Sequence, residues 1–267
     1  MLIAINKVKE DKYMLVVISP SKNLNEKDSR LVSPYTLPSF TLEAKRLILI
    51  LKKLSISEIS KLMGISLKLA ELNYIRYKNF KTPFTIKNSK QAISLFSGDV
   101  YQGFDSKTLS DQDLIYANKH LRILSGLYGL IMPLDIIQPY RLEMGTLLEN
   151  KNGKDLYAYW GNKLTKSLNN YFKNSDSKVL INLASKEYFK ALYFTKIKAQ
   201  VINIHFKEFR NGQLVFLSFN AKKARGLMSR FIIGNRIAQT EDIKQFNVEG
   251  YYFDEQRSTF NDWVFVR

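Results

Sequence analysis

Short apolar runs separated by polar loops are the first pattern along the chain. Met14–Ile18, Leu121–Leu124 and Val179–Leu183 are apolar at nearly every position and too short to favour helices, so each predicts a buried strand. Ala92–Phe96 is a similar run and predicts a further strand. No internal repeat and no long linker rich in Gly, Ser or Pro interrupts the pattern, which indicates one domain.

Helical patterns occur between these runs. Thr41–Leu54 has helical composition and carries two lysines near its end, where they suit the helix dipole. Ser110 with Asp113 has capping-box spacing and predicts a helix to about residue 119. Ser185 is predicted to cap another helix. Residues 248–267 indicate a closing β-hairpin with aromatic core residues.

Two short helices joined by a tight turn are predicted over residues 55–78. Ser55 and Glu58 have capping-box spacing, so the first helix should begin directly after Ser55. Gly64 should end it, because glycine accepts the left-handed conformation without a Cβ clash. Ser66 should cap the second helix.

This turn resembles a motif that binds nucleic acid. Leu62–Ala70 is similar to the helix-hairpin-helix signature L-P-G-I-G-x-x-x-A of DNA-repair proteins, with Met63 and Ser66 in place of the proline and the second glycine. In such hairpins, backbone amides at a helix start face a DNA phosphate, largely without reading sequence. An ordinary corner between two helices is the alternative. The predicted DNA-binding residues here are Gly64, Ile65, Ser66 and Lys68.

A second basic segment lies towards the end of the chain, where residues 209–240 contain no acidic residue. Asn211-Gly212 predicts a hairpin turn between strands at 201–209 and 213–219. Asn220 is predicted to cap a helix from 221 to about 237, whose basic side includes Gly226, where a missing side chain would let a phosphate approach. A solvated helix or a membrane-surface helix is the alternative. The predicted phosphate contacts are Lys222, Lys223, Arg225 and Arg230.

Composition adds a strong electrostatic expectation. The 267 residues carry a formal net charge of +17, which favours a polyanionic partner, although an AT-rich genome can also enrich lysine. Cysteine is absent and only two histidines occur, so we expect no thiolate or histidine metal site and no cofactor. No apolar run is long enough to span a membrane and no secretory signal is evident, so a cytoplasmic protein is expected.

A polar group in the middle of the chain offers a different chemistry. Asp99, Asp135, Arg141 and Glu143 lie in or beside loops that follow apolar runs, and Lys186 opens the helix after Ser185. Loops at strand ends are where binding and catalytic residues gather. A structural network of ion pairs is the alternative interpretation.

Several ordered segments together resemble the bacterial peroxide-stress YaaA family. They are Met14–Lys22 (MLVVISPSK), Lys68–Asn73 (KLAELN), Gly98–Gly103 (GDVYQG), Leu124–Leu130 (LSGLYGL), Gln138–Thr146 (QPYRLEMGT), Ile181–Tyr188 (INLASKEY) and Ala221–Met228 (AKKARGLM). The resemblance covers about residues 14–267. It makes residues 1–13 look like an extension, which we predict to be dispensable.

The resemblance implies a mixed α/β single domain with a fold of its own type, a helix-hairpin-helix element and a basic cleft. It also implies a cytoplasmic DNA-binding protein of the hydrogen-peroxide response that limits iron-linked damage, with no defined enzymatic activity. Since the chain has no cysteine and two histidines, shielding DNA is a simpler mechanism than binding iron.

Two hypotheses follow. In the first, the protein binds DNA without sequence preference, through backbone amides and Lys or Arg contacts to phosphate. In the second, it is an enzyme for an anionic or nucleotide-like substrate, in which Arg141 and Lys186 hold the anion and Glu143 or Asp99 acts as acid or base. Convergence of these four side chains on one pocket would favour the enzyme.

Overall fold

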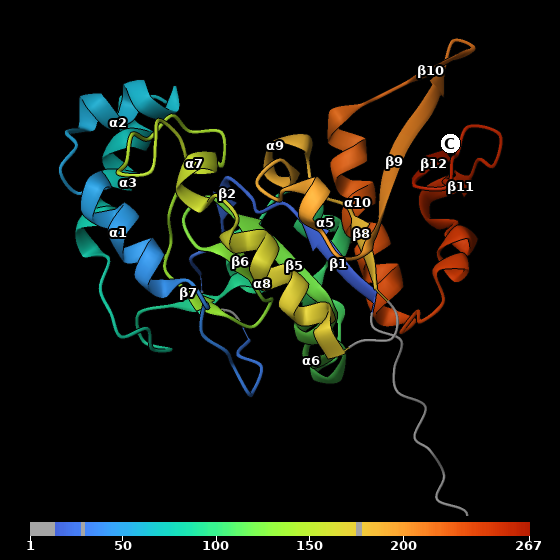
Figure 1. Ribbon diagram of the computed structural model, residues 1–267, viewed down its shortest axis with the longest axis horizontal. Helices are drawn as coiled ribbons and strands as arrows, with labels where there is room; N and C mark the ends of the chain where they lie inside the picture. The colour runs from blue at the N-terminus through green and yellow to red at the C-terminus, as the bar shows by residue number, and fades with distance from the viewer. Residues whose placement is uncertain (1–13, 28–29, 175–177) are drawn as a thin grey trace, which may run out of the picture.

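A mixed eight-stranded sheet forms the centre of the computed structural model, which describes residues 14–27, 30–174 and 178–267 (Figure 1). The strand order is β11-β12-β9-β8-β1-β5-β6, with β10 paired to β9. The five central strands, from β12 to β5, run parallel. The sheet consists of β1 (Met14–Ile18), β5 (Leu121–Ser125), β6 (Gly129–Ile131), β8 (Val179–Asn182), β9 (Gln200–Arg210), β10 (Gln213–Val215), β11 (Tyr252–Phe253) and β12 (Asp262–Val266).

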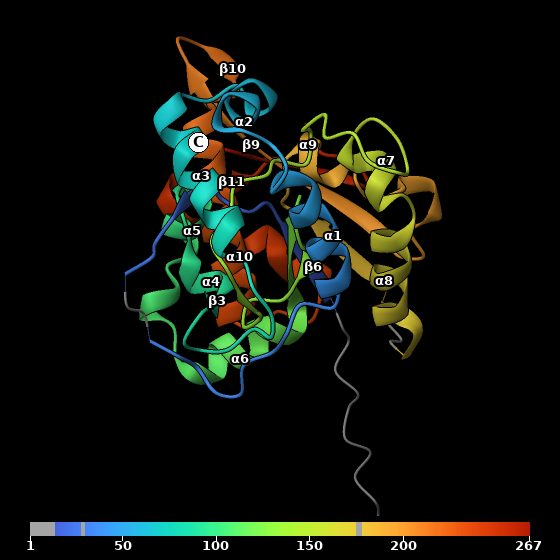
Figure 2. The same cartoon turned by 90° about the vertical axis from the view of Figure 1, so that its left-hand side faces the viewer.

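Helices cover both faces of this sheet. α8 and α9 lie on one face and α6 and α10 on the other, with α5 packed against α10 (Figures 1 and 2). α1, α2 and α3 form a separate group beyond the β6 edge (Figure 1). The helices are α1 (Thr41–Leu51), α2 (Ile56–Met63), α3 (Leu67–Asn79), α4 (Ala92–Leu95), α5 (Asp99–Phe104), α6 (Asp111–His120), α7 (Leu156–Trp160), α8 (Lys163–Tyr171), α9 (Lys186–Phe189) and α10 (Ser218–Gly234).

Short elements complete the chain. The 3₁₀ turns are η1 (Ser106–Thr108), η2 (Phe172–Asn174), η3 (Phe194–Lys196), η4 (Thr240–Gln245) and η5 (Val248–Gly250). Two small strand pairs join β2 (Asn23–Leu24) to β4 (Phe96–Ser97) and β3 (Lys90–Gln91) to β7 (Ile136–Ile137).

The apolar runs that predicted the central strands are confirmed. All five residues of β1 are buried, as expected for a parallel strand covered on both faces. β5 and β8 occupy the other two runs and pair with β1 on opposite sides. The sequence therefore places the middle of the sheet correctly, within one domain of mixed α/β type.

The predicted strand at Ala92–Phe96 is wrong. Ala92–Leu95 forms the single helical turn α4 between the short strands β3 and β4. The amides of Ala92 and Ile93 donate to the carbonyls of Asp135 and Pro133, at 2.8 and 3.0 Å, and these bonds hold the turn in place. A short buried apolar run has no periodicity that separates a strand from a helical turn.

The α2–α3 turn has the local geometry that its sequence predicts. Ser55 and Glu58 form a complete capping box at the start of α2. Gly64 ends α2 in the left-handed conformation, with φ of 59°. The Ser66 hydroxyl accepts the amide of Leu69 and caps α3. Capping box and glycine cap act within a few residues, so local sequence suffices to predict them.

The hairpin and helix near the end of the chain depart from their predicted bounds. Asn211 and Gly212 both have positive φ and join β9 to β10, which confirms the turn. However, β10 ends at Val215 and α10 begins at Ser218, so Asn220 lies inside the first turn rather than at the cap. α10 ends at Gly234. The closing pair β11–β12 is confirmed, with Trp263 and Phe265 buried.

Gly226 has a different role from the one predicted. A Cβ at Gly226 would meet the carbonyl oxygen of Val100 in α5 at 1.9 Å, and a Cβ at Gly103 in α5 would meet the carbonyl oxygen of Lys223 at 2.2 Å. The two glycines therefore let α5 and α10 cross in backbone contact. Gly226 is covered by protein and is not open to a phosphate.

Two sequence predictions concern the limits of the chain. Residues 1–13, the proposed extension, lie outside the described residues. Among the described helices, none has the length and apolarity that crossing a membrane requires.

Candidate functional site

The connections of the sheet change direction between β1 and β8. The chain leaves β1 and returns to the sheet as β5 on one side, whereas it leaves β8 and returns as β9 on the other side. In open α/β sheets, ligands bind outside the carboxyl ends of strands at such a switch point, because the diverging connections leave a crevice there. The loops after Ile18 and Asn182 therefore mark the candidate site.

Two serines join these loops directly. Ser19, immediately after β1, accepts the amide of Ser185 on its hydroxyl oxygen at 2.8 Å, and its own hydroxyl donates to Ser185 Oγ at 3.3 Å. Ser185 is also the N-cap of α9, as predicted. The two hydroxyls thus lie side by side at the carboxyl ends of β1 and β8.

Three charged residues meet between the loop after β1 and the loop after β7. Glu143 Oε1 accepts from Arg141 Nε at 3.0 Å and Nη2 at 2.9 Å, and lies 3.2 Å from Lys22 Nζ. Glu143 Oε2 is buried and has no hydrogen-bond partner among the described residues. We call the space around this group the switch-point crevice. It is lined by Pro20, Ser21, Lys22, Tyr140, Arg141, Leu142, Glu143 and Tyr188.

The crevice is narrow, and two of its three charged side chains are largely buried. Its free volume is about 10 Å³, close to the room that one water molecule needs. Arg141 and Glu143 are 16% and 14% exposed, whereas the Lys22 side chain is 61% exposed. Tyr77 of α3 donates its hydroxyl to the Arg141 carbonyl and so holds this loop. Lys22 is therefore the wall that can move most easily.

Buried tyrosines surround the charged group. Tyr101 donates its hydroxyl to the Ser19 carbonyl at 3.1 Å, and Tyr140 shares a 2.6 Å hydrogen bond with Ser125 Oγ. Burial raises the pKa of Tyr101, Tyr140 and Tyr188 well above the ordinary value of 10. These phenols therefore stay protonated at neutral pH and act as neutral donors or as walls.

The four residues of the enzyme hypothesis are only partly brought together. Arg141 and Glu143 are in direct contact. Asp99 begins α5 directly after Gly98, where a Cβ would lie 2.6 Å from Ser21 Oγ, and the exposed Lys186 follows Ser185. Within the described residues, neither Asp99 nor Lys186 forms a hydrogen bond or an ion pair with Arg141 or Glu143.

Asp135 belongs to a different part of the fold. It is 1% exposed, and its Oδ2 accepts the amide of Met132 at 2.8 Å. Burial raises the pKa of Asp135, and the charge of Arg122, near the start of β5, opposes this. Asp135 therefore stabilises the loop at the opposite end of the strands.

Sequence reasoning did not assign a role to Lys22, Ser19 or Ser185 in this site. The one signal in the sequence is their position, because Ser19 and Lys22 lie in the loop that follows the most apolar predicted strand. The contact of Lys22 with Glu143 joins residues more than a hundred positions apart in the sequence, which no local pattern reveals.

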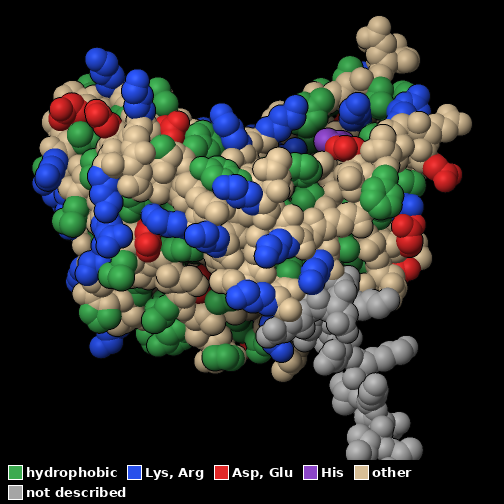
Figure 3. All heavy atoms as spheres, viewed as in Figure 1, with side chains coloured by type: hydrophobic (Ala, Val, Ile, Leu, Met, Phe, Trp, Pro, Cys, Tyr) green, Lys and Arg blue, Asp and Glu red, His purple; other side chains and the backbone are tan. Residues whose placement is uncertain are grey.

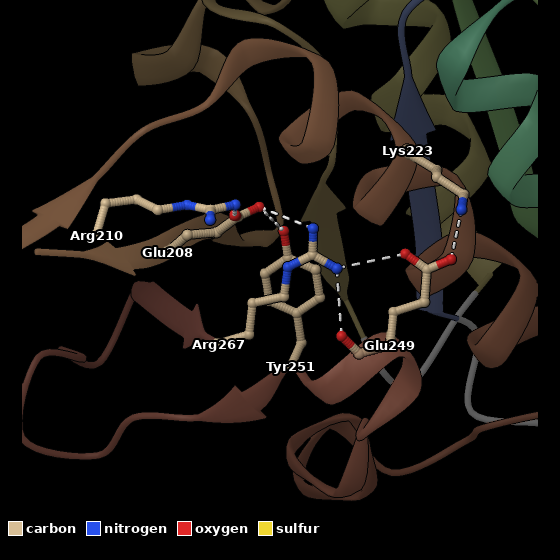
Figure 4. A network of polar contacts seen from close by, with 6 residues as sticks. All are labelled: Glu208, Arg210, Lys223, Glu249, Tyr251 and Arg267. Carbon is tan, nitrogen blue, oxygen red and sulfur yellow. Dashed lines mark hydrogen bonds and ion pairs between the residues drawn. The ribbon is translucent and has the colours of Figure 1, made fainter.

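The cations of α10 are mostly engaged with protein groups. Lys223 pairs with Glu249, which also contacts Arg267, and Arg267 reaches the buried Glu208 at 2.9 Å (Figure 4). Arg230 donates to the carbonyls at the end of α5, at 3.0 and 2.8 Å. Most of the predicted basic side therefore forms part of the protein's own structure.

Arg225 and Lys222 differ from these two residues. Burial lowers the pKa of Arg225, and its guanidinium has no partner among the described residues. Lys222 is exposed near the start of α10. Lys222 is thus the α10 cation with the best access to a ligand in solution.

The α2–α3 turn offers fewer amides than its sequence suggests. The amides of Gly64 and Ile65 both donate to the carbonyl of Ser60. Only the amides of Ser66, Leu67 and Lys68 remain without a partner in the part of the chain that the structure describes. No atom lies within 4 Å of the Cβ position of Gly64, so the turn is open to solvent.

Comparisons with known proteins agree on one family. The family model described as "Peroxide stress protein YaaA" matches residues 14–257. A UPF0246 protein of Burkholderia multivorans is 48% identical over 256 residues, which are 95% of this chain and 98% of that protein. UPF0246 proteins of Alteromonas mediterranea and Burkholderia orbicola are 48% and 47% identical, over the same shares of each chain.

Proposed function

The chain belongs to the YaaA family of peroxide stress proteins, and from this premise we propose that it is a sequence-independent DNA-binding protein of the cytoplasm. Bound to DNA during hydrogen-peroxide stress, it would shield the duplex from iron-linked oxidation. The α2–α3 turn is the observation that carries the proposal. It combines a left-handed glycine, an open surface and unpartnered amides at a helix start.

The turn suits a phosphate contact physically. The amides of Ser66, Leu67 and Lys68 open the 13-residue helix α3, where the helix dipole favours an anion. Lys68 is exposed in the same turn and adds a full charge. A phosphate bound there would receive amide hydrogen bonds and a lysine contact without any contact to a base.

The surface around the turn offers further cations. α2, α9 and the β9–β10 turn lie at the same end of the molecule in both ribbon views (Figures 1 and 2). Figure 3 shows a concave outline at this end, with lysine and arginine side chains on both of its sides. With a net charge of +17, such a surface attracts a polyanion through counterion release. In this proposal the duplex spans from Lys68 on α3 towards Lys222 on α10.

The test measures DNA affinity against salt concentration for single-charge variants. Lys68→Gln and Lys222→Gln should each weaken binding to a random-sequence duplex and reduce the log–log salt slope by about one. Lys166→Gln, in the exposed face of α8, removes the same charge from the same chain as a matched control and should leave the slope unchanged.

Ser66→Gly separates amide geometry from charge. The glycine restores the signature's second glycine and should hold or improve affinity, despite a loss of about 1 kcal/mol or less at the α3 cap. If Lys68→Gln and Ser66→Gly both bind duplex like the parent in low salt, the α2–α3 turn is an ordinary helical corner. If Lys68→Gln and Lys166→Gln changed duplex affinity and its salt slope equally, the net charge of the protein alone would explain binding, without a contact at the α2–α3 turn.

A further inference from the structure

We propose that the switch-point crevice binds a ribonucleotide. Glu143 would accept hydrogen bonds from the ribose hydroxyls, and Lys22 with the Ser19–Ser185 pair would hold the phosphate. The site is distinct from the α2–α3 turn, and the inference goes beyond DNA binding and does not depend on it.

The orphaned oxygen of Glu143 is the first observation. Oε1 has three donor contacts, whereas the buried Oε2 has none among the described residues. A buried carboxylate oxygen without a donor is costly, and native proteins rarely retain one without a reason. A ligand hydroxyl is a donor of suitable size for this crevice, and acidic residues accept ribose hydroxyls at other α/β switch points.

Lys22 and the two serines of the switch-point loops suit a phosphate. Lys22 Nζ offers three donor hydrogens and has a single acidic contact, so it can also donate to an anion. The hydroxyls of Ser19 and Ser185 lie at the carboxyl ends of β1 and β8. The exposed Lys186 follows Ser185 in the sequence. Glu187 directly follows Lys186 in the sequence. Its Oε1 accepts the amide of Gly145 at 2.9 Å.

The crevice itself has room for a ligand hydroxyl only, and the rest of the nucleotide would lie outside it, over the exposed Lys22. With Lys22 paired to Glu143 it has room for about one water molecule. Lys22 is 61% exposed, and Glu143 keeps two bonds from Arg141, so the lysine side chain can swing to an incoming phosphate without leaving the carboxylate unpaired. Arg141 would stay on Glu143 through its two bonds and hold the carboxylate in position.

The chemistry predicts discrimination between sugars. A ribonucleotide presents two vicinal hydroxyls to Glu143, whereas a 2′-deoxynucleotide presents one. The loss of a hydrogen bond to a charged group lowers affinity by about tenfold or more. DNA lacks the 2′-hydroxyl, so the crevice should prefer a free ribonucleotide to the sugar of a bound duplex.

Calorimetric titration of the full chain tests the proposal. The probes are the four ribonucleoside 5′-monophosphates and triphosphates, their 2′-deoxy counterparts and inorganic phosphate. We expect at least one ribonucleotide to bind about tenfold or more tightly than its deoxy form. Glu143→Gln should bring that ratio close to one, whereas Lys22→Gln should weaken both forms by a similar factor and keep the ratio.

Lys68→Gln is the matched control, because it removes a lysine outside the crevice. It should leave nucleotide affinity unchanged while it weakens DNA binding, so the two proposals can fail separately. Lys22 is exposed, so Lys22→Gln remains informative even if Glu143→Gln destabilises the loop. The proposal is overturned if none of the eight ribonucleotides binds, if ribose and deoxyribose forms bind equally to the parent, or if Lys22→Gln has no effect on affinity.

Discussion

Replacing Gly226 with alanine should destabilise the protein, whereas the same replacement at Gly234 in the same helix should not. A Cβ at Gly226 would lie 1.9 Å from the Val100 carbonyl oxygen and 2.8 Å from the Phe104 amide nitrogen. Side-chain Cβ atoms rarely approach closer than about 3 Å, so α10 would have to move away from α5 by about 1 Å. No atom lies within 4 Å of the Cβ position of Gly234.

The magnitudes follow from this geometry. Forcing an extra methyl into a packed contact typically costs about 1–3 kcal/mol, and here both contacts are backbone atoms that a rotamer change cannot relieve. Better helix propensity returns about 0.5–1 kcal/mol. We expect a net loss of about 2 kcal/mol for Gly226→Ala, and a lowering of Tm by roughly 4–8 °C for a chain of this size. Gly234→Ala should gain up to about 1 kcal/mol, because only the propensity term remains.

Urea denaturation and thermal melts of the parent and both variants measure these changes. Duplex affinity at 20 °C, where both variants should be folded, gives a second reading. A Gly226→Ala protein as stable as the parent would refute the close crossing of α5 and α10. If that variant kept its stability but lost DNA affinity, Gly226 would instead be a site of phosphate approach.

The remaining predictions concern pH and the start of the chain. Burial raises the pKa of Glu208, but hydrogen bonds from Asn220, Arg267 and Tyr251 outweigh it and hold the pKa below 4.5. The ionised Glu208 should therefore stabilise the protein at pH values above the pKa that it has in the unfolded chain, and this effect should be lost as the pH falls through its lower pKa in the folded protein. Glu208→Gln should flatten the acid side of a curve of unfolding free energy measured from pH 7 to 3. Parallel curves for the parent and the variant would contradict this. Deletion of residues 1–13 should leave Tm and duplex affinity unchanged, and a drop of several degrees would show that they contribute a structural element.

The helix caps show how much the sequence can predict. The capping box at Ser55, the glycine cap at Gly64 and the N-cap at Ser66 were all predicted from residues within four positions of one another. Such interactions are local, so the residue types and their spacing determine them almost without tertiary context. The same reasoning placed β1, because a buried parallel strand is apolar throughout.

The switch-point crevice could not be predicted in this way. Lys22 and Glu143 meet because the loop after β1 and the loop after β7 converge at the carboxyl end of β1. Each is an ordinary charged residue in a loop, and the sequence carries no signal that links them. Strand order decides the site, and strand order depends on the sum of many long-range contacts.

The basic side of α10 shows the difference between periodicity and access. Helical periodicity indicates which residues share a side, but it does not indicate what covers that side. Lys223 forms an ion pair with Glu249, and Arg230 donates hydrogen bonds to the carbonyls at the end of α5. α5 itself covers Gly226. Since each engaged cation is lost to phosphate binding unless its protein contact breaks, a count of basic residues overestimates the DNA contacts of this helix. The salt slope should therefore respond to Lys222 by about one unit and hardly to Lys223 or Arg230, in contrast to the equal contributions that charge alone predicts.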